Sequence, residues 1–346
     1  MKYRFVTLVL IVLAVLGATV PLACDSTKEA ESYGPPQVHF PEDEGAHPQS
    51  EVEWWYLNAT LHDAQGHGYT AMVAYFAPTL RIISISDLAT NTFYHEVPDY
   101  LDLVAGITRN YAEGSLDLQW DETDRWYKID ADSDSYQIKT EGETIGFDLH
   151  IVSEKAPLIV GGDGLIEWTQ GSTYYYSLTG LQVEGQIEFA GMTVDVEGIG
   201  WMDHQWMGEA AQKGWDWFSV QLDDNTDIIC WQIIDDDGSV ASRDLTMMFT
   251  DESIYHTEDF DLEKTATWTS PDTGKEYGTV WKLTEGEHDL DLEIKARFNK
   301  QEILLFREQP TLASQFWEGG TTVSGQLEGQ DVSGIGYAEL VPHKEQ

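Results

Sequence analysis

Basic residues are scarce in this sequence: 19 lysines and arginines stand against 61 aspartates and glutamates, a formal net charge of −42. A chain this negative is repelled by a phosphate backbone, which excludes nucleic acid as an expected partner. An anionic membrane surface repels it too, so any membrane attachment has to be hydrophobic or covalent. Acidic runs such as Asp235-Asp236-Asp237 lack EF-hand spacing, and we interpret them as a solvated surface suited to high salt.

Cysteine is nearly absent, with two residues in 346, and one of them carries a prediction. A basic start and the apolar residues 5–20 precede Cys24, the order of a lipoprotein-type export signal. We therefore expect residues 1–23 to be a signal peptide, Cys24 to be lipidated after cleavage, and residues 24–36 to be a flexible tether. An uncleaved anchor helix is the alternative. Either way, the chain is predicted to be exported and membrane-anchored, facing the periplasm or the exterior.

Lipidation of Cys24 leaves Cys230 without a partner, so no intrachain disulfide is expected in the mature protein. Cys230 lies in an apolar run and is predicted to be a buried thiol. Other chemistry-bearing motifs are missing as well. The sequence contains no Gly-x-Ser-x-Gly elbow and no phosphate-binding glycine loop. His39, His47, Asp203 and His204 have no metal-ligand spacing, so neither a cofactor nor a metal is expected.

Sustained helical periodicity is also missing beyond the N-terminal apolar segment. Short alternating runs separated by turn residues predict strands instead, as in the expected hairpin of residues 53–61 and 69–76. The glycine-marked segments 183–188 and 196–201 recur as 323–328 and 332–337. The offset of about 140 residues matches one eight-stranded barrel.

We predict an all-β chain of two lipocalin-like antiparallel β-barrels in tandem, at residues 37–208 and 209–343. Chance similarity of two glycine-rich hairpins is the alternative reading of the repeat.

The first candidate site cluster is Glu53-Trp54-Trp55-Tyr56. Strand alternation puts Glu53 and Trp55 on one face, and Trp54 and Tyr56 on the other. If the face of Glu53 is interior, burial is expected to raise the pKa of its carboxyl group; an edge carboxylate in water is the alternative.

The second and third clusters also combine acids with aromatic rings. In the run from Trp201 to Trp206, Asp203 and His204 are adjacent, and they share a site only if a bulge interrupts strand alternation. A structural hydrogen bond between them is the alternative. In the third cluster, which also contains Phe316-Trp317-Glu318-Gly319, Tyr337 and Glu339 share a face and can line a cavity; a purely structural role is the alternative.

These clusters together resemble the carotenoid 1,2-hydratase (CrtC)/AttH family. The resemblance covers about residues 38–341 and rests on Glu44-Gly45-Ala46-His47-Pro48, Glu53-Trp54-Trp55-Tyr56, Tyr174-Tyr175-Tyr176-Ser177, Gly200-Trp201-Met202-Asp203-His204-Gln205-Trp206, Trp215-Asp216-Trp217-Phe218, Trp317-Glu318-Gly319 and Gly336-Tyr337-Ala338-Glu339-Leu340. It implies tandem lipocalin-like domains with a hydrophobic pocket. The family includes carotenoid hydratases, kievitone hydratase and fungal Diels–Alderases, and many bacterial members are secreted and encoded beside ABC-type permeases. Met207 and the stretch Glu42-Asp43-Glu44-Gly45, which lacks a histidine, depart from the family pattern.

The resemblance implies a hydrophobic, isoprenoid-like or polyketide-like small molecule as partner and acid-catalysed hydration of an alkene. Asp203 is the expected proton donor and His204 the residue that positions water. The expected substrate-binding residues are Glu53, Trp55, Tyr176, Trp201, Trp206, Trp217, Glu318, Tyr337 and Glu339. A non-catalytic lipocalin carrier working with an ABC-type permease is one alternative, and a pericyclase acting by shape alone is another.

Overall fold

The structure is a computed structural model that describes residues 36–77, 80–97, 109–130, 133–168, 171–208, 214–307 and 313–342. Strands dominate these ranges, and their one short 3-10 helix is η1 (Glu42–Glu44). None of the helices in these ranges is long and apolar enough to cross a membrane. The predicted signal peptide and Cys24 lie outside the described residues, so export and lipidation stay predictions.

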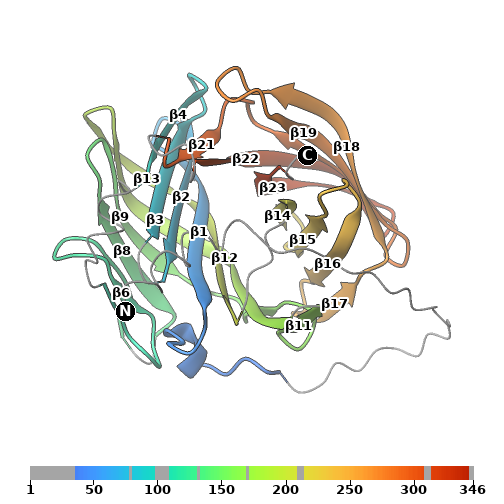
Figure 1. Ribbon diagram of the computed structural model, residues 1–346, viewed down its shortest axis with the longest axis horizontal. Coiled ribbons are helices and arrows are strands. Elements are labelled where there is room, and N and C mark those ends of the chain that lie inside the picture. The colour runs from blue at the N-terminus through green and yellow to red at the C-terminus, as the bar shows by residue number, and fades with distance from the viewer. Residues whose placement is uncertain are drawn as a thin grey trace.

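A first antiparallel sheet of 13 strands is built from the N-terminal part of the chain (Figure 1). Its hydrogen-bonded order is β4-β3-β2-β1-β13-β12-β9-β8-β7-β6-β5, with β10 and β11 paired to β12. The strands are β1 (Val52–His62), β2 (Gly68–Phe76), β3 (Leu80–Asp87), β4 (Thr92–Glu96), β5 (Asn110–Tyr111), β6 (Asp117–Gln119), β7 (Arg125–Lys128), β8 (Ser135–Glu141), β9 (Ile145–Val152), β10 (Leu158–Ile159), β11 (Leu165–Trp168), β12 (Gly171–Phe189) and β13 (Met192–Met207).

A second antiparallel sheet of ten strands lies beside the first and is coloured yellow to red in Figure 1. Its order is β17-β16-β15-β14-β23-β22-β20-β19-β18, with β21 paired to β22. The strands are β14 (Gly214–Leu222), β15 (Asp227–Ile234), β16 (Val240–Met248), β17 (Ile254–Thr257), β18 (Phe260–Thr269), β19 (Glu276–Glu285), β20 (Leu290–Ala296), β21 (Glu302–Leu305), β22 (Ser314–Leu327) and β23 (Gln330–Val341).

Both sheets are curled (Figure 1). Each is a half-barrel rather than a closed barrel, because its hydrogen-bonded order has two ends in the described residues. In the first sheet, Glu96 at the end of β4 connects this edge strand to the hairpin between β8 and β9. Its carboxylate accepts hydrogen bonds from the backbone N–H groups of Glu143, Thr144 and Ile145, in the turn and first residue of the hairpin between β8 and β9. The all-β class and the lipocalin-like antiparallel sheets are thus confirmed, whereas the domain limits at 208 and 209 stay a prediction.

The repeated sequence segments form equivalent hairpins, β12–β13 and β22–β23. In each sheet the second strand of the hairpin pairs with the first long strand of its half, β1 or β14, and the first pairs with β9 or β20. Gly185 and Gly325 occupy equivalent positions, with φ of 146° and 158°. An added Cβ there would lie 2.1 Å and 2.0 Å from the carbonyl oxygens of Asp148 and Asp291, so both positions require glycine.

Buried hydrophobic side chains of the described residues form three clusters. One lies inside the first sheet and includes Trp55 and Trp206; one lies inside the second and includes Phe218 and the buried thiol Cys230, as predicted. The third cluster draws aromatic residues from both sheets and forms the interface between them. The candidate functional residues lie in the first and third clusters.

Candidate functional site

Strand alternation divides the residues of β13 between two environments. Trp201 packs in the cluster between the sheets, whereas Met202 and Trp206 pack inside the first sheet. The register with β1 is unbroken from Met207 to Glu197, so no bulge interrupts the alternation. Asp203 therefore faces the interface and His204 faces the interior of the first sheet. The structure does not bring the predicted catalytic pair together.

Asp203 is the centre of a hydrogen-bonded group at the interface. Its side chain is 3% exposed and accepts hydrogen bonds from Ser177 Oγ at 2.6 Å, Tyr175 Oη at 2.5 Å and Trp201 Nε1 at 2.6 Å. Tyr175 Oη also accepts a hydrogen bond of 2.9 Å from Nε1 of Trp217, on the second sheet. The carboxyl group is thus tied to both halves of the molecule.

Two glutamates of the second sheet complete an interface carboxyl cluster, which we define as Asp203, Glu318 and Glu339. Glu318 is buried and accepts a hydrogen bond of 3.0 Å from Tyr56 Oη of the first sheet. Glu339 is partly buried and accepts a hydrogen bond of 3.1 Å from Trp215 Nε1. Glu318 lies directly opposite Glu339 on β22 and β23. Like charges in such a pair repel, which favours a proton on one of them.

Burial raises the pKa of all three carboxyl groups. It raises the pKa of Asp203 to about 6, against the opposing effect of its hydrogen bonds from Ser177, Tyr175 and Trp201. It raises the pKa of Glu339 to about 7, with the hydrogen bond from Trp215 opposing and the charge of Asp203 adding to the rise. Burial, together with the charge of Glu339, raises the pKa of Glu318 well above its ordinary range. Near neutral pH the cluster therefore contains both proton donors and a carboxylate.

Aromatic side chains surround this cluster. Tyr337 is buried, and Tyr56 packs edge-on against the rings of Trp217 and Tyr337 at centroid distances of 5.6 and 6.4 Å. Apolar side chains that keep partial exposure form a rim around the hydrophobic cluster between the sheets, to which Tyr56, Trp217 and Tyr337 belong: Trp54, Phe76, Leu80, Phe93, Val97, Ile166, Trp215, Ile233, Ile254, Phe306 and Val341. An apolar rim beside protonated carboxyl groups suits a hydrophobic ligand that undergoes proton transfer.

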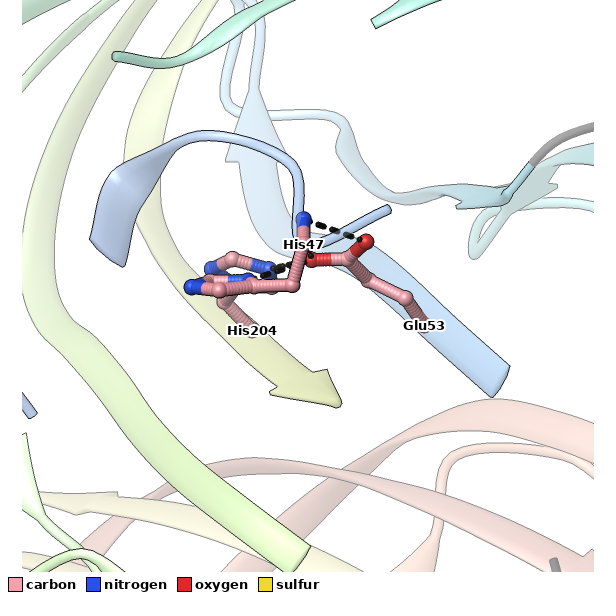
Figure 2. Close-up of side chains that lie close together, drawn as sticks. All are labelled: His47, Glu53 and His204. Carbon is pink, nitrogen blue, oxygen red and sulfur yellow. Dashed lines mark hydrogen bonds and ion pairs between the residues drawn. The ribbon is translucent and has the colours of Figure 1, made fainter. Parts of the chain in front are cut away.

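A second group, the His47–Glu53–His204 cluster, lies inside the first sheet (Figure 2). Glu53 Oε1 lies 2.7 Å from His47 Nδ1 and 3.0 Å from His204 Nε2. The Glu53 carboxylate also accepts a hydrogen bond from the His47 backbone N–H, at 2.9 Å to Oε2. Glu53 and His204 are 4% and 0% exposed, whereas the side chain of His47 is 22% exposed.

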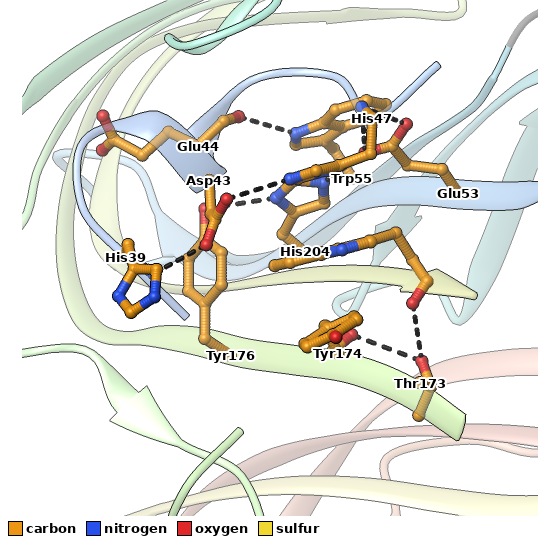
Figure 3. Close-up of polar contacts among 11 residues, drawn as sticks. His39, Asp43, Glu44, His47, Glu53, Trp55, Thr173, Tyr174, Tyr176 and His204 are labelled. Carbon is orange, nitrogen blue, oxygen red and sulfur yellow. Dashed lines mark hydrogen bonds and ion pairs between the residues drawn. The ribbon is translucent and has the colours of Figure 1, made fainter. Parts of the chain in front are cut away.

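Aromatic rings and polar groups hold this cluster in place (Figure 3). Trp55 stacks on His204 with centroids 4.4 Å apart, and Trp206 stacks on His47 at 4.0 Å. His47 Nε2 lies 3.1 Å from Asp43 Oδ1, and His204 Nδ1 lies 3.4 Å from Tyr176 Oη.

The prediction that Glu53 and Trp55 share one face of the strand and Tyr56 takes the other is correct. Glu53 and Trp55 lie inside the first sheet, and Tyr56 lies at the interface. The expectation of a raised pKa for Glu53 is wrong. Burial alone would raise it, but the hydrogen bonds and charges of His204 and His47 lower the pKa of Glu53 overall.

The predicted site residues thus separate into two groups. The interface receives Trp201, Asp203, Trp217, Glu318, Tyr337 and Glu339, and the interior of the first sheet receives Glu53, Trp55, Tyr176, His204 and Trp206. Sequence reasoning placed Tyr56 in a candidate cluster without giving it a role. It gave no role to Tyr175, Ser177 and Trp215 either, although alternation along Tyr174–Ser177 opposite β13 carries that signal. Asp43 and His47 precede the first strand, where no periodicity is available to place a side chain.

Two cavities lie outside both groups. A cavity of about 860 Å³ lies against the second sheet, and its lining combines charged residues such as Arg243 and Lys264 with Trp281 and Leu340. A cavity of about 450 Å³ lies between the halves and is lined by residues such as Lys155, Ile199 and Ile335. Ile199 lies four residues from Asp203 on β13, and Ile335 lies four residues from Glu339 on β23. Four residues span roughly 13 Å along a strand, so this cavity is separate from the carboxyl groups.

Comparison with known proteins agrees with this architecture. A crystal structure described as AttH from Nitrosomonas europaea has a TM-score of 0.75, with 24% identity over 89% of this chain and 97% of that one. Kievitone hydratase from Nectria haematococca has a TM-score of 0.70, with 19% identity over 91% and 97%. CghA in complex with Sch210972 has a TM-score of 0.59, with 14% identity over 85% and 89%. These likenesses show the shared fold.

A curated relative, the dehydratase asqC of Emericella nidulans, is 21% identical over 216 residues. That match spans 59% of this chain and 60% of the length of the relative. The sequence model of the family described as AttH-like matches residues 31–342, which is nearly the whole chain. The chain therefore belongs to the AttH-like family.

Proposed function

We propose that this protein binds an apolar, unsaturated small molecule between its two sheets and adds water to, or removes it from, a carbon–carbon double bond. The observation that carries the proposal is the interface carboxyl cluster: three acids with raised pKa values among aromatic rings, beside a partly exposed apolar rim. Acid-catalysed hydration requires a neutral proton donor, a dry aromatic wall and one water.

The hydrogen bonds favour different roles for Glu339 and Asp203. Glu339 accepts one hydrogen bond and has a pKa near neutrality, as a proton donor requires. Asp203 accepts three, which stabilise its carboxylate. We assign proton donation to Glu339, whereas the sequence had assigned it to Asp203. His204 faces the other cluster and has no role in this step.

In the hydration direction, Glu339 transfers its proton to one alkene carbon, which forms a C–H bond and leaves a carbocation on the neighbouring carbon. The Asp203 carboxylate and the rings of Trp217 and Tyr337 stabilise that cation. Water forms the new C–O bond and releases its proton to Asp203, and exchange with solvent restores both groups. Dehydration is the reverse sequence. The names of two similar proteins, a hydratase and a dehydratase, support both directions of this chemistry.

The test is isotope incorporation from water labelled with heavy oxygen, using a panel of isoprenoid and polyketide alkenes and the corresponding alcohols. We expect label in the hydroxyl group of the reacting compound. Glu339→Gln and Asp203→Asn should each lower turnover by about 10²–10⁴-fold. The matched control is Glu293→Gln, which changes an exposed glutamate of β20 and should leave turnover unchanged. Undiminished turnover in both interface variants contradicts the proposal.

A non-catalytic carrier is a second candidate, because the cavity against the second sheet has a volume in the range of small-molecule pockets. Mass spectrometry of compounds extracted from the purified protein separates the two: a ligand that remains unchanged in labelled water favours the carrier.

We also propose, from the sequence alone, that the chain is exported and anchored through a lipid on Cys24, where an ABC-type permease is a proposed partner. Pericyclase chemistry, the third alternative, would persist after Asp203→Asn and Glu339→Gln.

A further inference from the structure

We propose that His47, Glu53 and His204 form a binding site for a divalent transition-metal ion of the zinc class, inside the first sheet and separate from the interface carboxyl cluster. Nδ1 or Nε2 of each histidine and a carboxylate oxygen of Glu53 lie within 4.8 Å of one another. His47 precedes β1, Glu53 lies on β1, and His204 lies on β13, which pairs with β1.

Two of the three spacings between donor atoms are close to those of a four-coordinate zinc site, and all three donor atoms lie within 4.8 Å of one another. Tetrahedral zinc with ligands at about 2.0–2.1 Å places neighbouring donor atoms about 3.3 Å apart. The Glu53 oxygen lies 2.7 Å from one histidine nitrogen and 3.0 Å from the other. A shift of a few tenths of an ångström opens these contacts enough for an ion, and the loop that carries His47 is the part best able to make it.

The hydrogen-bond count of the two imidazole rings also favours a cation. Three of their four nitrogens face a carboxylate oxygen: Nδ1 and Nε2 of His47 and Nε2 of His204. Two neutral imidazoles have only two N–H groups, so one lone pair must face an oxygen. A metal ion bound to Glu53 uses one lone pair of each ring. The remaining N–H of His47 then points at the Asp43 carboxylate, and that of His204 at the backbone of Asp43 and at Tyr176 Oη.

The surroundings resemble those that orient metal ligands in proteins. A carboxylate on the second nitrogen of a ligating histidine fixes the ring and increases its basicity, which is the position of Asp43 on His47. The His47 backbone N–H holds the Glu53 carboxylate, and the Trp55 and Trp206 rings fix the two imidazole planes. Asp43 and Glu53 together supply two negative charges, which balance one divalent ion.

The donor set indicates the class of ion. Two histidines and one carboxylate suit zinc or a neighbouring transition metal, whereas calcium and magnesium prefer oxygen ligands. Three protein ligands leave one position of a four-coordinate ion for water or a ligand, the composition of catalytic rather than structural zinc sites. The partly exposed His47 provides the route by which such an ion exchanges with solvent.

The test is zinc binding by the full chain. The protein is stripped of metal with a chelator and then dialysed against Zn²⁺ as the sole transition metal. Mg²⁺ is present in excess so that it, and not zinc, occupies the exposed carboxylates of this acidic surface. We expect one zinc ion retained per chain, measured by elemental analysis. His47→Ala and Glu53→Gln should lose that ion, and Asp43→Asn should bind it about 10–100-fold more weakly. Co²⁺ substituted for zinc should give the visible absorption bands of a four- or five-coordinate ion.

The matched control is His150→Ala, which removes a partly exposed histidine that pairs with Glu184 on the same sheet. This variant should retain zinc as the wild type does. Circular dichroism and thermal unfolding establish that each variant is folded, and His47→Ala carries the least risk because its side chain is partly exposed. Equal zinc retention in the wild type, His47→Ala and Glu53→Gln overturns the proposal. Failure of the wild type to retain stoichiometric zinc does so as well, and identifies the cluster as an ion pair with a protonated histidine.

Discussion

Asp203 and His204 are neighbours in the chain, yet their side chains enter different chemical environments. Successive residues of a strand point to opposite faces of the sheet, and β13 lies between an intersheet interface and a sheet interior. At the interface, Asp203 lies among hydrogen-bond donors and apolar rings. In the interior of the first sheet, His204 contacts the carboxylate of Glu53 and the stacked ring of Trp55. One dipeptide therefore contributes to two separate groups.

The raised pKa of Glu339 predicts a pH dependence of stability. The folded protein holds this proton up to about pH 7, while the unfolded chain releases it near 4.5. Between these values the native state binds more protons, so stability falls as the pH rises, by at most about 3 kcal/mol, and the loss is complete above pH 7. Glu339→Gln should flatten this part of the profile, measured by urea unfolding at pH 4.5 to 8.

The surface acids also weaken the fold as they ionise, so the difference between variants is the relevant quantity. Glu293→Gln, an exposed glutamate of the same sheet, provides the reference. A Glu339→Gln profile parallel to that of Glu293→Gln would show that Glu339 releases its proton at the same pH in both states.

Most of the chemical groups at the candidate site were recognisable from the sequence, but their grouping was not. Motifs identified Asp203, Glu318 and Glu339, and alternation correctly paired Glu53 with Trp55. The pKa of Glu53 was predicted in the wrong direction because His47 reaches it from a loop. Periodicity carries no information about a loop residue, and the partner His204 is 151 residues away in the chain.

Two equivalent hairpins organise both sheets at the scale of the elements. β13 and β23 carry Asp203 and Glu339 at corresponding positions, each beside the first long strand of its half: Tyr56 lies opposite Asp203, and Trp217 opposite Glu339. Tyr56 then binds Glu318 across the interface, and Trp217 binds Tyr175 in the reverse direction. The duplicated hairpin thus supplies both walls of the site.

The glycine in each hairpin gives a stability prediction for this element. Gly325→Ala should destabilise the protein by about 3 kcal/mol, because the new Cβ would meet the backbone of β20 and the φ of 158° disfavours a side chain. Gly286→Ala is the control, since its Cβ meets nothing within 4 Å. Urea unfolding of the two variants measures the difference. Equal midpoints for Gly325→Ala and Gly286→Ala would contradict the close approach of β22 to β20.

At the scale of the whole molecule, contacts across the interface join the two sheets. Besides the aromatic contacts, Lys155 of the first half bonds Asp227 of the second at 2.6 Å, and Ser86 bonds Gln301 at 2.7 Å. Asp203 and Glu318 are both buried at this interface, where Tyr56 of the first sheet binds Glu318 and Trp217 of the second sheet binds Tyr175, the partner of Asp203. The raised pKa values at the proposed site are therefore a property of the assembled molecule.

Whole-molecule charge gives a prediction about location. A net charge of −42 repels anionic lipid, so we propose that membrane attachment comes from acyl chains on Cys24, at about 0.8 kcal/mol per buried CH₂ group. Cys24→Ser should move the exported chain from the membrane fraction to the soluble fraction, as measured by fractionation and immunoblotting. Continued sedimentation of this variant with membranes would favour the uncleaved anchor helix instead.

The sequence by itself determined the β class, the repeated hairpins and the chemical groups, because these depend on local alternation, turn residues and motifs. Only the tertiary structure decided that Asp203 and His204 belong to different groups, that three acids from two sheets lie together, and that His47 meets Glu53. The physical reason is that these contacts join residues up to 262 positions apart, as Tyr56 and Glu318 are, and the burial that sets their pKa values exists only once both sheets have packed.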